Sequence, residues 1–274
     1  MARRRYGFTE EKIQRFIKQG RGKGEGATYK PWLTVADVPS LGRVHRVYCP
    51  KTGRAHHLLS DNEYYAFLLQ WWDDSVVDIQ EQFPLIDRKE TLEIAALCGV
   101  RHPVDPVSGA LWVMTTDLLL TRHASHGAET AAYAVKQAEA LADERTLEKL
   151  EIERRYWERR EVRWSVLTNE QVKTTYTRNL AWILDADRPG DDGASSDEIA
   201  ADVRRELAAE IRERPHAPVR LACGAIDQKL GRRPGTALAA LRKLLGAKLV
   251  RTDLRARLLQ DLPVQAFSIS GGVS

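Results

Sequence analysis

Residues 111–136 constrain the fold of this chain more than any other stretch. Two runs rich in β-forming residues, LWVMTTDLLLT and TAAYAVK, flank the polar segment RHASHGAE, a pattern that predicts a β-hairpin with a longish connection. With the turn centred near positions 125 and 126, Asp117 lies opposite Ala134. Because side chains alternate along a strand, Lys136 shares that face. An acid beside a lysine forms the core of the active site in metal-dependent phosphodiesterases, although many sheets carry such a pair on a solvated face.

Length and charge set wide bounds on what the chain does. Its 274 residues, 43% of them hydrophobic, suffice for one large domain or two of ordinary size. A formal charge of +4 permits an anionic partner without requiring one. The basic residues concentrate at the start, since residues 1–32 carry nine Lys/Arg against three Glu, a local net of +6.

The cysteines and the hydropathy pattern indicate a soluble protein of a reducing compartment. Cys49, Cys98 and Cys223 are far apart and form no CxxC pair, so neither a zinc site nor a disulfide framework is indicated. No apolar run has the length of a membrane span, and no apolar core follows the basic N-terminus as in a signal peptide. We therefore expect a cytoplasmic location and no membrane partner.

The first 26 residues predict a short helix followed by a glycine-rich loop. Residues 9–19 (TEEKIQRFIKQ) have an amphipathic pattern, with Thr9 as the N-cap and Gly20 as the stop. In the following GRGKGEG, Lys23 precedes glycine rather than Ser or Thr, which excludes a nucleotide P-loop. The loop is either flexible and basic or a contact for nucleic-acid phosphates, and the basic helix before it favours contact.

Residues 41–59 alternate like a second hairpin, with the turn at 50–53. This hairpin carries three histidines, His45, His56 and His57. Their spacing matches no standard zinc pattern, so surface or hydrogen-bonding roles are favoured over metal binding.

Glu63 has two interpretations. Ser60 and Glu63 form a capping box ahead of a helix with Tyr64, Phe67, Leu68 and Trp71 on one side. A cap accounts for the glutamate by pattern alone. Yet Glu63 lies one turn before Phe67 and borders the core-facing stripe, so its carboxylate is also placed to point at the sheet.

The remaining N-terminal elements complete a mixed sheet flanked by helices. We expect a strand at 76–86, a helix at 88–98, a charged and mainly solvated helix at 143–160 and a short buried strand at 164–167. The order is helix, hairpin, helix, strand, helix, hairpin, helix, strand, which is typical of an α/β fold.

A second region follows a linker predicted at about 188–197, where RPGDDGASSD is rich in Gly, Ser, Asp and Pro. Beyond it the pattern predicts helices at 197–213, 218–230 and 235–245, then strands at 248–254 and 264–269. Helix-turn-helix plus two strands is a winged-helix pattern. Such modules bind either DNA or proteins, and the net charge of +5 over 197–274 leaves both open.

Five segments of the chain resemble the TnsA family, the endonuclease subunits of heteromeric cut-and-paste transposases. They are KPWLTVADVPS, GRVHRVYCPKTGRAHHLLSDNE, VVDIQEQFPL, MTTD and, most specifically, DERTLEKLEIERRYW. The resemblance covers residues 7–170 and is thin over 171–274. It implies a restriction-endonuclease-like catalytic domain at 1–170 and a smaller winged-helix-like domain at 171–274.

The resemblance also implies an activity, partners and a site. In this family TnsB cuts and joins the 3′ ends of the element, TnsA cuts the 5′ strands, and the C-terminal domain contacts the ATP-dependent regulator TnsC. A bacterial, nucleoid-associated protein is expected.

The catalytic acids of the family map onto Glu63 and Asp117, and its lysine onto Lys136. We expect Mg²⁺, with Mn²⁺ as a substitute, held by both acids and the Val135 carbonyl. Contacts to transposon-end DNA are expected from Arg3, Arg4, Arg5, Lys18, Arg21, Lys23, His56 and His57.

Ala134 departs from the pattern of this fold, whose nucleases usually carry Glu, Asp or Gln two residues before the lysine. Three consequences are open: the site works without that ligand, metal affinity falls, or the chain is an inactive variant. The last two favour an alternative function, an assembly subunit that binds DNA and its partners with a weak or dead nuclease site. A stand-alone restriction or repair nuclease is a third reading.

Overall fold

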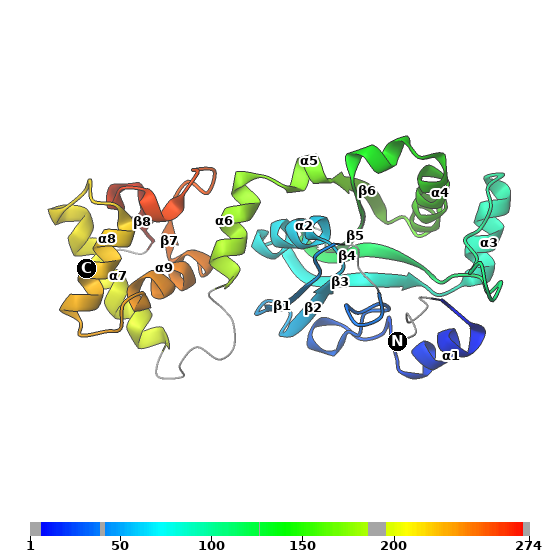
Figure 1. Cartoon of the computed structure of the whole chain (residues 1–274), viewed down its shortest axis with the longest axis horizontal. Helices are drawn as coiled ribbons and strands as arrows, with labels where there is room; N and C mark the ends of the chain where they lie inside the picture. The colour runs from blue at the N-terminus through cyan, green and yellow to red at the C-terminus, as the bar shows by residue number, and fades with distance from the viewer. Residues whose placement is uncertain (1–6, 39–41, 126, 186–195, 271–274) are drawn as a thin grey trace. The chain divides into compact units, whose positions relative to one another are not determined.

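The computed structural model describes residues 7–38, 42–125, 127–185 and 196–270. The chain divides into two compact units, Met1–Lys173 and Thr174–Ser274 (Figure 1). Most of the predicted linker lies outside the described residues, and its last two positions form the first turn of a helix.

The first unit has the order of elements that the sequence predicted. The helices are α1 (Glu10–Lys18), α2 (Asp61–Trp72), α3 (Arg88–Leu97), α4 (Glu144–Glu158) and the short α5 (Asn169–Val172). The strands are β1 (His45–Cys49), β2 (Arg54–Leu58), β3 (Val76–Leu85), β4 (Met114–Ala124), β5 (Gly127–Lys136) and β6 (Arg163–Thr168). Thr9 caps α1 as expected, because its side chain accepts the Lys12 amide.

The central sheet is mixed and has the order β3-β4-β5-β6. β3/β4 and β4/β5 pair antiparallel, whereas β5/β6 pair parallel. In the long hairpin Leu118 pairs with Tyr133 and Ala124 with Gly127. Continuing this register by one residue sets Asp117 opposite Ala134, as predicted. The second predicted hairpin is also present, and β1 and β2 form a separate two-stranded sheet.

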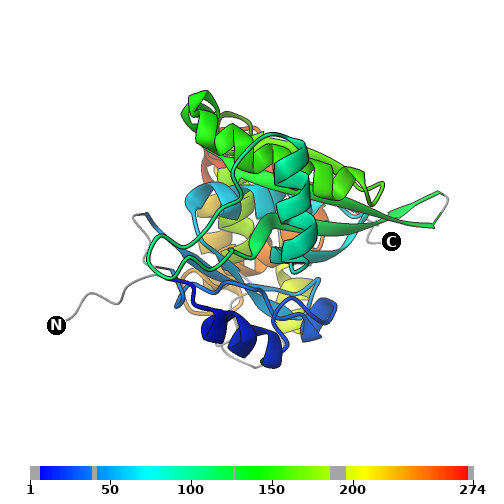
Figure 2. The same cartoon turned by 90° about the vertical axis from the view of Figure 1, so that its right-hand side faces the viewer.

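Two hydrophobic clusters hold the sheet in place. Leu119 and Ala132 pack against α3 and α4 through Ile94, Ile152 and Trp157. These two helices lie side by side, and the β4–β5 hairpin extends beyond them (Figure 2). The second cluster anchors α1 and the segment after it, and consists of Phe8, Ile13, Phe16, Trp32 and Val113.

One burial prediction for this unit was wrong. β6 is partly exposed rather than buried, because it pairs only with β5 at the edge of the sheet. In α3, Ile94 is buried, whereas Leu97 is 65% exposed at the end of the helix.

The second unit contains four α-helices among its described residues: α6 (Thr175–Leu184), α7 (Ser196–Glu213), α8 (Val219–Lys229) and α9 (Thr236–Gly246). α6 was not predicted. The two predicted strands shrink to two residues each, β7 (Val250–Arg251) and β8 (Ser268–Ile269), which pair antiparallel. The winged-helix assignment therefore stays a prediction.

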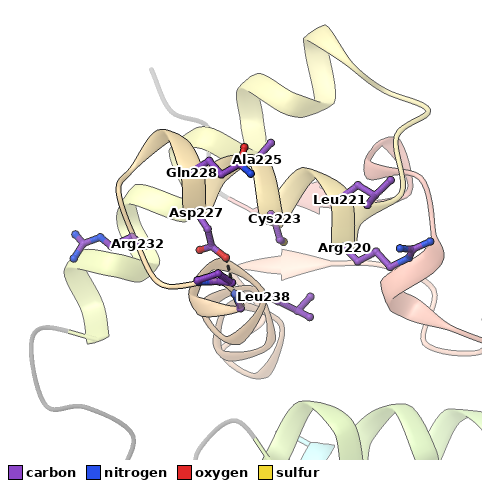
Figure 3. Close-up of a pocket in the computed structure, with 11 residues that line it drawn as sticks. Arg220, Leu221, Cys223, Ala225, Asp227, Gln228, Arg232 and Leu238 are labelled. Carbon is purple, nitrogen blue, oxygen red and sulfur yellow. Dashed lines mark hydrogen bonds between the residues drawn. The ribbon is translucent and has the colours of Figure 1, made fainter.

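A tight turn joins α8 to α9. The Asp227 carboxylate on α8 accepts the backbone amides of Gly235 and Ala237, each at 2.7 Å, and so caps α9. Beside this turn lies a cavity of about 420 Å³ lined by Arg220, Cys223, Asp227, Arg232 and Leu238 among others (Figure 3). No helix among the described residues is long and apolar enough to cross a membrane.

Candidate active site

Asp117 and Lys136 meet in the structure as the hairpin register requires. Asp117 Oδ2 accepts hydrogen bonds from Lys136 Nζ at 2.7 Å and from the Val135 amide at 2.6 Å. Lys136 Nζ also donates to the Val135 carbonyl at 3.1 Å. The three groups that the sequence assigned to the two hairpin strands therefore form one contact cluster.

Glu63 both caps its helix and faces the cluster. The Ser60 hydroxyl accepts the Glu63 amide at 3.1 Å, and the Glu63 carboxylate accepts from the Ser60 hydroxyl and the Leu59 amide, each at 3.0 Å. Glu63 is nevertheless only 7% exposed. Its Oε2 also accepts a 3.3 Å hydrogen bond from the side chain of Gln82 on β3. The two roles considered for this residue coexist.

Gln82 links the two acids and was missed by the sequence analysis. Its Nε2 donates to Glu63 Oε2 and to Asp117 Oδ1, each at 3.3 Å. The amide therefore spans the space between the carboxylates. Gln82 lies within VVDIQEQFPL, one of the segments that resemble the TnsA family, but strand alternation does not say which buried polar residue of that strand faces an acid.

Glu153 on α4 is the second missed residue. It is 5% exposed and accepts hydrogen bonds from Thr116 Oγ1 at 2.9 Å and Trp164 Nε1 at 3.1 Å. A signal for it was present, since Glu153 lies between Leu150 and Trp157 at helical spacing, on the stripe that packs on the sheet. The expectation of a solvated charged helix was wrong at this position.

The site gathers negative charge in a poorly solvated place. Burial, and then the charge of Asp117, raises the pKa of Glu63 to about 7 and that of Glu153 to about 7. Burial by itself lowers the pKa of Lys136, but the nearby carboxylates of Asp117 and Glu153 outweigh it, and that pKa is raised. One ammonium thus stands among three acids.

The donor atoms suit a hard divalent cation. Mg²⁺ prefers oxygen ligands and is usually held by one or two carboxylates, with water and substrate phosphate completing its shell. Glu63, Asp117 and the Val135 carbonyl are donors of that kind. Across the described part of the chain, no group of three or more His, Cys, Asp or Glu side chains is arranged to hold a metal. The acids here alone do not complete a metal cage.

The three histidines are engaged elsewhere. His56 is 0% exposed and its ring contacts Glu81 Oε2 at 2.8 Å and the Thr52 hydroxyl at 2.7 Å, so the predicted DNA contact by His56 is wrong. His57 is half-buried and accepts the Val35 amide through Nδ1. His45 pairs with Asp61 and stacks on Tyr64.

The predicted basic DNA contacts fall into three groups. Arg21 is only 16% exposed in its side chain, pairs with Asp37 at 2.6 Å and lies over the Phe16 ring, so it holds the loop together. Lys18 and Lys23 are exposed. Arg3, Arg4 and Arg5 lie outside the described residues.

The glycine-rich loop between α1 and β1 has a defined backbone. Gly22 donates to the Lys30 carbonyl at 2.6 Å, and Lys30 donates back to the Lys23 carbonyl at 3.1 Å. Gly22 has a φ of +77°, and a Cβ added there would lie 2.2 Å from Cγ of Pro84. The loop therefore rests on β3 rather than forming the loose connection that its composition allowed.

Comparisons with known proteins place this geometry in a family. The family model "TnsA-like endonuclease N terminal" matches residues 73–169, and "TnsA endonuclease C terminal" matches residues 171–254. The chain is 39% identical over 258 residues to the Transposon Tn7 transposition protein TnsA of Escherichia coli, a match covering 93% of this chain and 90% of that protein. The chain belongs to the TnsA endonuclease family. The N-terminal match contains Gln82, Asp117, Lys136 and Glu153, while Glu63 precedes it.

Proposed function

We propose that this chain is the metal-dependent endonuclease subunit of a heteromeric transposase, and that it hydrolyses a phosphodiester at the 5′ ends of the transposon during cut-and-paste transposition. The observation that carries the proposal is the convergence of Glu63 from α2, Asp117 from β4 and Lys136 from β5. Three separate elements meet at one partly buried cluster of two carboxylates and an ammonium in a chain of the TnsA family.

In this proposal Glu63, Asp117 and the Val135 carbonyl hold Mg²⁺, for which Mn²⁺ substitutes. When bound, the cation lowers the pKa of a water and offsets charge on the attacked phosphate. A lysine with an ordinary pKa is an ammonium at neutral pH. In this proposal Lys136 therefore orients the water or stabilises the phosphate charge. Such electrostatic help is typically worth about 3 kcal/mol.

The remaining contacts follow from the family and the charge distribution. The first unit is a restriction-endonuclease-like domain, and its basic N-terminal segment, with the exposed Lys18 and Lys23, holds the DNA backbone. A TnsB-like transposase selects the transposon ends and cuts the other strand. The second unit is a winged-helix-like domain that contacts a TnsC-like ATP-dependent regulator.

Strand-specific cleavage by the purified assembly tests the proposal. Asp117→Ala should abolish 5′-strand cutting while the partner still cuts the 3′ strand. Glu139→Ala, an exposed acid just beyond β5, should leave both cuts unchanged. Unchanged 5′-strand cutting by Asp117→Ala would contradict the assignment of this site as the nuclease centre. Cutting by the isolated chain would instead favour a stand-alone nuclease.

Ala134 motivates a second candidate, an assembly subunit with a weak or inactive site. Its side chain is fully buried opposite Asp117 and offers only a methyl group. Calorimetric titration with Mn²⁺ separates the two candidates. Binding by the wild-type chain supports the nuclease, whereas binding only by Ala134→Gln supports the assembly subunit. A melting curve of the variant controls for the larger side chain in a packed site.

A further inference from the structure

Gln82 occupies an unusual backbone position next to the site. Its φ is +49°, in the left-handed region that residues other than glycine rarely adopt. Glu81 pairs with Leu118 and Phe83 with Thr116, so Gln82 lies opposite Asp117 at the step between them. Strained backbone conformations persist only where the surroundings enforce them, and they gather at functional sites.

The surroundings that enforce this conformation are visible on both sides of the residue. The Gln82 carbonyl accepts the amide of Trp32, a fully buried member of the cluster that anchors α1. On the other side, the Gln82 side chain is almost fully buried and its Oε1 accepts the Thr115 hydroxyl at 3.1 Å. The amide is therefore held with its nitrogen between the two acids.

This amide supplies a polar group to a site that lacks one on its β5 side. On β5, the position opposite Asp117 carries the buried methyl group of Ala134. Gln82 approaches Asp117 from β3, the neighbour on the other side, and reaches both acids with one nitrogen. A side-chain amide carries both an N–H donor and a carbonyl acceptor. A buried amide that contacts two carboxylates is therefore suited to donate to them when no metal is bound and to offer its oxygen to a cation that they hold.

We propose that Gln82 is the third metal-binding side chain of this centre, after Glu63 and Asp117, and that it serves two states. In the metal-free protein its Nε2 clamps Glu63 and Asp117 together. With a divalent cation between the acids, the amide turns over and presents Oε1 to the cation. This inference rests on the proposed function, because it assigns a further oxygen to the same metal site.

The turn of the amide leaves its outer hydrogen bond intact. The two ends of a glutamine amide exchange places by rotation about its last side-chain torsion. The Thr115 hydroxyl donates to Oε1 in the present orientation, and a hydroxyl equally accepts from an N–H group. Only the contacts to the acids change, and the cation takes over the pairing of those two carboxylates.

The test uses the full chain in two assays: calorimetric titration of the chelator-treated protein with Mn²⁺, and its melting temperature without metal. Gln82→Met removes both polar atoms at nearly constant size and should weaken Mn²⁺ binding at least tenfold.

Gln82→Glu replaces the N–H donor with a third carboxylate. It should bind Mn²⁺ at least as tightly as wild type and melt at a lower temperature than Gln82→Met without metal. Gln80→Met, on the same strand but bonded to the Gly24 carbonyl, should match wild type in metal binding.

We expect Gln82→Glu to keep or raise the affinity for Mn²⁺ and to lower the melting temperature of the metal-free protein. A purely structural role for Gln82 does not predict these opposite effects. Wild-type affinity in Gln82→Met, or an equal loss in Gln82→Glu, overturns this inference alone. A wild-type chain that takes up no Mn²⁺ overturns the proposed function and this inference with it. Gln82→Asn covers failure of the other variants to fold, since asparagine tolerates positive φ but its amide is one carbon short. It should fold and bind Mn²⁺ weakly, and wild-type binding by it contradicts the inference.

Discussion

Replacing Glu153 with glutamine should stabilise the metal-free protein at alkaline pH and have little effect at acidic pH. The pKa of the buried Glu153 rises from an ordinary 4.5 to about 7 in the folded chain, chiefly through burial and then through Asp117. An acid with a raised folded pKa stabilises the fold fully below its unfolded pKa, and this contribution is lost as pH rises through the folded value. At about 1.4 kcal/mol per pKa unit, the loss is roughly 3 kcal/mol between pH 4.5 and pH 8.

Urea unfolding of wild type and Glu153→Gln in the presence of a chelator measures this difference. The glutamine keeps an oxygen for Thr116 and Trp164, so the variant should match wild type near pH 5 and exceed it by roughly 3 kcal/mol at pH 8. Glu158→Gln, exposed on the same helix, should show no such divergence. If the unfolding free energies of Glu153→Gln and wild type instead differ by the same amount from pH 5 to pH 8, the fold does not disfavour the ionised form of Glu153.

Two further substitutions test how the first unit is built. Glu81→Gln removes the negative charge from a buried ion pair and leaves the Arg54 guanidinium without its counter-charge, so chemical denaturation should show a loss of about 3–5 kcal/mol; a loss below 1 kcal/mol would contradict this. Gly22→Ala combines positive φ with a clash against Pro84 and should cost more than about 2 kcal/mol. Gly20→Ala, with a φ of +72° but no neighbour within 4 Å, isolates the backbone strain, and equal losses in the two glycine variants would remove the case for the clash.

Local patterns were enough to predict the hairpin and the capped helices. Alternation and the position of the turn fixed the register that brings Asp117 to Lys136, because a shift by one residue reverses every side chain of a strand. Ser60 marked the start of α2 and so gave Glu63 a definite place in the first turn. These features depend on neighbours within a few residues or across one turn.

The residues that were missed depend on tertiary packing. Gln82 reaches both acids from a backbone conformation that no sequence rule assigns to glutamine. Glu153 faces the site because α4 turns that side to the sheet. Arg21 and His56 look like solvent-facing basic residues in the sequence, yet each has a carboxylate partner distant in the chain, Asp37 and Glu81. Composition does not reveal such long-range pairs.

Anomalous diffraction from crystals soaked in Mn²⁺ is the direct test of a metal-dependent centre built on Glu63, Asp117 and Lys136. We expect a peak between the carboxylates of Asp117 and Glu63, within coordination distance of both, with the amide oxygen of Gln82 turned towards it. A map with no peak there at saturating Mn²⁺, or with its only peak at the histidines of the β1–β2 hairpin, would contradict it.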